Sequence, residues 1–73
     1  MDKGYQNRIR KCFKIAFEML EKHYRADSLD DFRTAFDEFS ELAKDDELLS
    51  ELLIAVYGEL KRNWELRHKE IVK

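Results

Sequence analysis

Proline is absent from this 73-residue chain, glycine occurs twice and cysteine occurs once. Without proline, no helix has to be interrupted by a residue that lacks a backbone N–H. A single cysteine excludes an intrachain disulfide framework, and we expect a chain with one unpaired thiol to belong to a reducing compartment. No apolar run approaches the roughly 20 residues that a helix needs to cross a bilayer. A small helical domain without disulfides is therefore the first expectation.

The beginning of the chain, Met1 to Tyr5, has no apolar stretch of the kind that a signal peptide requires. We therefore expect a cytoplasmic protein that makes no membrane contact. Charged residues form 41% of the chain and apolar residues 44%, so there is enough apolar surface for a core. One domain is expected over residues 1–73. A domain of this size buries only about 60–65% of its unfolded surface, so self-association would add stability.

Apolar residues recur at spacings of three and four along most of the chain, which predicts amphipathic helices. The expected helices span about 3–24, 29–44 and 46–72. Ser28, followed three residues later by Asp31, indicates a capping box at the start of the second helix. Asp45, Asp46 and Glu47 favour a helix start because acidic side chains suit the positive end of the helix dipole.

The boundary between the second and third helices has neither glycine nor proline, so one unbroken helix from Ser28 onward is an alternative. The helical phase favours a break. At about 100° per residue, the apolar arc of the third segment is rotated by roughly 100° from that of the second. Short connections make neighbouring helices antiparallel. The prediction is an all-α, small antiparallel three-helix bundle with a long third helix that overhangs its partners from Asn63 onward.

The apolar faces define a candidate core, with Phe13, Phe36 and Leu53 expected at its centre. The full set is Ile9, Phe13, Ala16, Phe17, Leu20, Phe32, Phe36, Phe39, Leu49, Leu52, Leu53, Val56 and Leu60. Cys12 lies on the same face, where a free cysteine behaves as a small hydrophobic residue. His23 lies at the edge of that face near the end of the first helix, and we expect it to pack or to cap.

The third helix carries more apolar residues than closing the bundle requires. Trp64 and Ile71 continue its stripe beyond the reach of the shorter helices. Ile54 lies off the main arc, one turn from Gly58, where a glycine would let another backbone approach. Tyr57 and Trp64 are seven residues apart, a spacing that a partner helix or groove can recognise. The expected partner-binding residues are Ile54, Tyr57, Gly58, Trp64, Arg67 and Ile71.

A different interpretation of Trp64 stays open. The last turns of the third helix could fray, and the indole could fold back onto the turn between the first two helices near Tyr24. In that case Trp64 would belong to the fold and not to a binding surface.

Charge is segregated along the chain. Residues 1–25 carry a net charge of +4, residues 26–51 carry −8 and residues 52–73 carry +2. Complementary flanks of this kind favour one arrangement of the bundle. Two binding functions also remain as alternatives. The first is a nucleic-acid-associated regulator that uses the basic first helix, and the second is an inhibitor that presents the acidic segment as a mimic of DNA.

No set of residues has the spacing of a catalytic or metal site. Glu65 and His68 match the Glu-x-x-His spacing of di-iron bundles, which need two such motifs and two further carboxylates. The acids at 45–47 lack the glycine and the distal glutamate of a calcium loop. We expect no enzyme activity, cofactor, metal or small-molecule substrate. The chain is predicted to be a protein-interaction or regulatory module that acts through its third helix, binding another protein or forming a homodimer.

Overall fold

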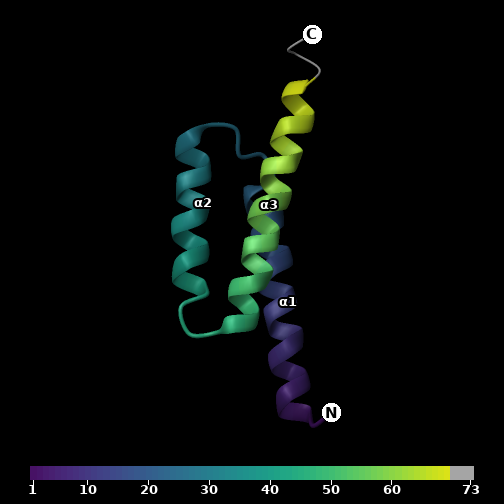
Figure 1. The fold of residues 1–73 in the computed structure, drawn as a ribbon. Helices are drawn as coiled ribbons and strands as arrows, with labels where there is room; N and C mark the ends of the chain where they lie inside the picture. Colours follow the sequence, from purple (N-terminus) through teal and green to yellow (C-terminus); the bar gives the residue numbers. More distant parts are fainter. Residues whose placement is uncertain (70–73) are drawn as a thin grey trace.

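The computed structural model describes residues 1–69, and Ile71 of the expected binding surface lies outside them. Three helices lie within these residues: α1 (Lys3–His23), α2 (Leu29–Leu42) and α3 (Glu47–Lys69). Figure 1 shows α1 and α3 running in the same direction, with α2 returning in the opposite direction. The prediction of an all-α three-helix bundle with separate second and third helices is confirmed. None of the helices in the described part is long and apolar enough to cross a membrane.

A polar side chain caps the start of each helix. Asp2 accepts a backbone hydrogen bond in the first turn of α1. At α2, Ser28 Oγ accepts from the Asp31 N–H at 3.1 Å and the Asp31 carboxylate accepts from the Ser28 N–H at 3.2 Å, which is the predicted capping box. At α3, Asp46 Oδ1 accepts from the Leu49 N–H at 3.1 Å. These bonds satisfy backbone N–H groups that the first turn of a helix leaves without a partner. They also fix where α2 and α3 begin, although neither connection between the helices contains glycine or proline.

Small side chains lie where the helices meet. Ala35 is 0% exposed and Ala16 is 6% exposed, and Cys12 is buried beside them as expected. Leu53 and Leu60 of α3 are the largest fully buried side chains. The buried cluster consists of Cys12, Ala16, Ala35, Phe39, Leu49, Leu53 and Leu60. Small side chains allow helices to pack closely. α3 packs along α1 more extensively than along α2, and α1 and α2 contact each other least.

The predicted central position of two phenylalanines is wrong. Phe13 is 54% exposed, Phe36 is 58% exposed, and Phe17, also expected in the core, is 60% exposed. Leu53 is buried as predicted. The other expected core residues that are not fully buried are half-buried: Ile9, Leu20, Phe32, Leu52 and Val56.

The reason lies in the width of the apolar arc on α1. From Ile15 to Phe17 this arc spans about 200° at 100° per residue, which is more than two neighbouring helices can cover. The bundle uses the side that carries Cys12 and Ala16, because small side chains permit the closest helix contact. The larger aromatic residues on the other side of the arc are left outside the core.

The bundle is elongated. It measures 52 × 21 × 16 Å and has a radius of gyration of 14.1 Å, against about 11 Å for a compact chain of this length. Its accessible surface is 5940 Å², against about 4,800 Å² for a compact monomer of the same mass. Figure 1 shows the first turns of α1 and the last turns of α3 extending past α2 at opposite ends.

The complete burial of Ala35 predicts a strong cost for added volume. Ala35→Leu should lower the free energy of unfolding by about 1–3 kcal/mol, because the extra carbon atoms have no space around the buried side chain. The same change at the exposed Ala55 is the matched control and should stay within about 0.5 kcal/mol of the parent. Urea unfolding followed by circular dichroism measures both. Equal stabilities for the two variants would contradict close packing around Ala35.

Candidate functional site: the surfaces on either side of α3

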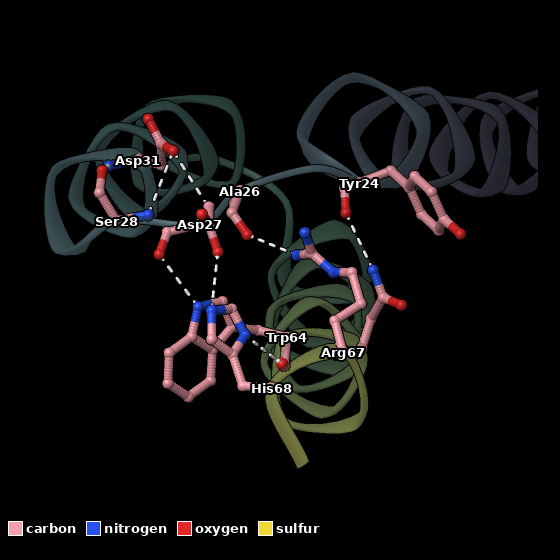
Figure 2. Close-up of polar contacts among 9 residues, drawn as sticks. Tyr24, Ala26, Asp27, Ser28, Asp31, Trp64, Arg67 and His68 are labelled. Carbon is pink, nitrogen blue, oxygen red and sulfur yellow. Dashed lines mark hydrogen bonds and ion pairs between the residues drawn. The ribbon is translucent and has the colours of Figure 1, made fainter. Parts of the chain in front are cut away.

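Side chains from the end of α3 hold the connection between α1 and α2 (Figure 2). Each donates a hydrogen bond to a backbone carbonyl oxygen of that connection: Asn63 Nδ2 to Tyr24 at 2.9 Å, Trp64 Nε1 to Asp27 at 3.0 Å, and Arg67 Nη2 to Ala26 at 2.7 Å. A connection of this kind exposes carbonyl oxygens that the helices cannot satisfy. The three donors supply the missing partners and fix the position of the turn.

His68 completes this cluster. Its ring stacks on the Trp64 indole with centroids 4.2 Å apart, its Nδ1 lies 2.9 Å from the Trp64 carbonyl oxygen, and its Nε2 lies 3.1 Å from Asp27 Oδ1. The histidine of the Glu65-x-x-His68 motif is therefore engaged in packing and hydrogen bonding within the chain. Among residues 1–69 there is no group of three or more His, Cys, Asp or Glu side chains that could hold a metal ion.

The premise that Trp64 has no partner within the chain is wrong. The α1–α2 connection lies against Trp64 (Figure 2), and Trp64 also lines a hollow with Leu29 and Phe32 at the start of α2. The open interpretation is correct in that the indole meets this turn, but the last turns do not fray, because α3 is helical to Lys69. Helix lengths alone missed this contact because they compare helix with helix and leave out the loop. The signal in the sequence was three side-chain donors on one face of the third helix, at Asn63, Trp64 and Arg67.

Asp46 joins the start of α3 to α1. Besides capping α3, its carboxylate lies 3.3 Å from Arg8 Nη2 and accepts a hydrogen bond from Cys12 Sγ at 3.5 Å. The Leu49 N–H, with further contributions from Cys12 and Arg8, lowers the pKa of Asp46 below its ordinary value. Burial, followed by the hydrogen bond to Asp46, raises the pKa of the Cys12 thiol. The thiol is thus kept protonated, which suppresses its reactivity as a nucleophile.

The acidic second helix pairs with the basic first helix through Glu38. Lys22 Nζ and His23 Nε2 each lie 2.6 Å from one of its carboxylate oxygens. The hydrogen bond from Lys22, followed by that from His23, lowers the pKa of Glu38. The His23 ring also packs edge-on against Phe39, with centroids 5.5 Å apart. Complementary charge thus stabilises the contact between α1 and α2, and it engages part of the basic surface that a nucleic acid would need.

An apolar hollow of about 210 Å³ lies between α2 and α3. We call it the α2–α3 groove; its lining includes Phe36, Ser40, Ala43, Ser50, Ile54 and Tyr57. The Tyr57 ring meets Phe36 and Phe32 edge-on, with centroids 6.0 Å away in both cases. Ile54 is 69% exposed, and a Cβ added to Gly58 would meet nothing within 4 Å. The fold therefore brings Tyr57 and Ile54 of the expected binding surface beside Phe36, a residue expected in the core.

Exposed acidic side chains lie on both helices that form the α2–α3 groove. Asp37 and Glu41 follow groove residues in the sequence of α2. Glu47 and Glu51 lie three residues before Ser50 and Ile54 on α3, and they also line a second hollow beside α1. All four acids are exposed. This acidic rim, formed by Asp37, Glu41, Glu47 and Glu51, would attract a positively charged partner toward the apolar groove.

Protein-family models, curated proteins and solved structures were each compared with the chain, and none of them matches it. The function is therefore inferred from the geometry and charge of this chain alone.

The bond between Trp64 and the α1–α2 connection predicts a measurable contribution to stability. Trp64→Phe keeps an aromatic ring and removes the N–H donor, so the Asp27 carbonyl loses its partner. We expect a loss of about 1 kcal/mol in the free energy of unfolding. Arg62→Met is the control on the same helix, because Arg62 pairs with the exposed Glu59 one turn away, and it should change stability by less than about 0.5 kcal/mol. Unchanged stability of Trp64→Phe in urea unfolding would contradict the role of this bond.

The lowered pKa values of Asp46 and Glu38 predict that acid destabilises the fold. The unfolded chain, whose carboxyl groups keep their ordinary pKa values of 3.8 and 4.5, takes up protons first as the pH falls. The stabilisation is complete above those values and is lost as the pH passes through the lowered pKa values, between about pH 5 and pH 2. Asp46→Asn still caps α3 but has no carboxylate to protonate. The melting temperature of this variant should fall less steeply with acid than that of the parent.

Asp45→Asn is the control for this pH dependence, because Asp45 forms no hydrogen bond or ion pair within the described residues. Its melting temperature should follow that of the parent at every pH. If Asp46→Asn also follows the parent, the Asp46 carboxylate does not contribute to the acid sensitivity.

Proposed function

We propose that this chain is a small protein-interaction module that binds an amphipathic helix of a partner protein in the α2–α3 groove. The observation that carries the proposal is the exposure of Phe36 and Ile54 around an open apolar hollow, with the half-buried Tyr57 between them. Large apolar side chains gathered at an open groove are typical of helix-in-groove recognition. The binding surface includes α3, as the sequence predicted, and α2 forms its other side.

The size of the groove supports a side chain as its occupant. Its volume of about 210 Å³ is below the roughly 300–1,000 Å³ of pockets that enclose small molecules. Aromatic residues such as Tyr57 and Phe36 are favoured at binding sites because they bury a large area with few rotatable bonds. A leucine or phenylalanine anchor on the partner helix would fill the hollow and cover Ile54.

The acidic rim specifies the chemistry of the partner. Asp37, Glu41, Glu47 and Glu51 would each need a lysine or arginine on the polar edges of the bound helix. Charges at the rim of an interface raise the association rate and select among partners more than they raise affinity. The partner is thus a basic amphipathic helix, and its binding weakens as salt screens the rim.

Two other parts of the expected surface have different roles in this proposal. Trp64 and Arg67 bond to the α1–α2 connection, so the module uses them to hold its own fold. Gly58 is open to solvent and adjoins Tyr57 on the helix, so the partner backbone can approach it closely. We place the module in the cytoplasm, because its one thiol is buried and held protonated and a reducing compartment suits such a chain.

A labelled peptide tests the groove directly. The probe is a fluorescein-labelled amphipathic helix of leucine and lysine, about 18 residues long, and its counterpart has glutamate in place of lysine. Fluorescence anisotropy should show saturable binding of the lysine peptide that weakens with salt, and no binding of the glutamate peptide. Ile54→Ser should weaken the lysine peptide by about ten-fold or more.

Leu66→Ser is the matched control for the peptide experiment. Leu66 is also an exposed aliphatic residue of α3, at 64% exposure, but it lies outside the groove lining. Its affinity for the peptide should equal that of the parent. Two results would overturn the proposal. In the first, Ile54→Ser and Leu66→Ser reduce the peptide affinity equally; in the second, neither variant changes it. Either result would show that the peptide does not bind in the groove.

A further inference from the structure

One side of α1 carries a row of apolar residues that the bundle leaves uncovered. Tyr5, Phe13, Phe17 and Tyr24 are each more than half exposed. At about 100° per residue, these four and the half-buried residues between them share an arc roughly 120° wide. We call this arc the aromatic face of α1: Tyr5, Ile9, Phe13, Phe17, Leu20 and Tyr24. A monomer rarely exposes a continuous apolar surface of this kind unless the surface binds something.

The excess surface of the chain has the size of a dimer interface. The accessible surface of 5940 Å² exceeds that of a compact monomer by roughly 1,100 Å². A stable interface of standard size removes about 800 Å² from each partner. Covering the aromatic face would therefore return the surface of each chain to an ordinary value. The lining of the α2–α3 groove shares no residue with the hollow beside this face, although Glu47 and Glu51 of the acidic rim line that hollow.

We propose that a second copy of this chain covers the aromatic face, with the two α1 helices packed antiparallel about a two-fold axis. The spacing of the row is complementary to itself in this direction. When the axis passes between Phe13 and Phe17, each Phe13 lies opposite Phe17 of the second copy. The same alignment brings Ile9 within one residue of the position opposite Leu20. It brings Tyr5 within one residue of the position opposite Tyr24, so every large side chain of the face lies near an apolar partner.

Charges at the edge of the aromatic face support the antiparallel direction. Arg10 and Glu21 lie at that edge, within about 20° of each other around the helix. Both are exposed, and neither forms an ion pair within the described residues. In the antiparallel alignment Arg10 lies within one residue of the position opposite Glu21 of the second copy, close enough for the long side chains to pair, and this contact occurs twice. A parallel pair would instead place the edges that carry these charges on opposite sides of the interface, so Arg10 and Glu21 would not meet.

A hollow beside the aromatic face gives the second copy a place to enter. It measures about 460 Å³ and lies between α1 and the start of α3. Its lining includes the apolar Tyr5, Phe13 and Leu48 and the charged Arg8, Glu47 and Glu51. Tyr24 of the second copy would reach this end of α1 in the antiparallel alignment. The interface would then extend from α1 onto α3 and bury the half-exposed Leu48.

Analytical ultracentrifugation of the full chain at tens of micromolar tests the dimer. We expect a dimer for the parent. Phe17→Ser should shift the protein to monomer while its helical circular dichroism stays unchanged, because Phe17 is outside the core. Ile54→Ser changes the α2–α3 groove and should remain dimeric, so failure of the dimer and failure of the groove give different results. A monomeric parent overturns the proposal, as does a dimer that Ile54→Ser disrupts and Phe17→Ser does not.

A charge exchange tests the alignment. Arg10→Glu and Glu21→Arg should each weaken the dimer by about ten-fold or more, because each places like charges near one another at two symmetric positions. The double variant, Arg10→Glu with Glu21→Arg, restores opposite charges and should recover the dimer of the parent. A double variant that is weaker than both single variants, or single variants without effect, overturns the antiparallel alignment.

Discussion

The burial of small side chains on α1 and α2 is the constraint on which the rest of the structure depends. Cys12 and Ala16 of α1 and Ala35 of α2 belong to the buried core, and small side chains let neighbouring helices approach closely. The larger aromatic residues are thereby moved to the flanks of α1 and α2. The α2–α3 groove and the aromatic face of α1 are both apolar surfaces that remain exposed because the bundle buries the sides of α1 and α2 that carry the small residues.

Polar contacts close the two ends of the bundle, and α3 takes part in both. At its start, Asp46 caps α3 and also contacts Arg8 of α1. Near its end, Trp64 and Arg67 satisfy carbonyl oxygens of the α1–α2 connection. A small apolar core limits how much stability burial can supply. Directional bonds at both ends therefore fix the position of α3 along its neighbours, which apolar packing alone would leave free to slide.

The two proposed surfaces are compatible with each other. The aromatic face of α1 and the lining of the α2–α3 groove share no residue, so a dimer through α1 would leave a groove open on each copy. Two grooves on one particle would let the module hold two basic helices, or two sites of one partner, and binding at the second site would then be favoured by its high effective concentration. In these proposals the acidic rim would set the charge of that partner, whereas Arg10 and Glu21 beside the aromatic face would pair between two copies.

The sequence by itself determined the three helices, the break before α3, the capping box of Ser28 and the burial of Cys12, because periodicity and capping act over a few residues. It placed Ile54 and Tyr57 on a helix face but could not identify Phe36 as their neighbour. Only the tertiary structure decided which part of the broad apolar arc is buried, since that depends on how closely the helices approach. It also decided the role of Trp64, because the carbonyl that its indole meets belongs to a connection far away in the chain, and no local pattern encodes that contact.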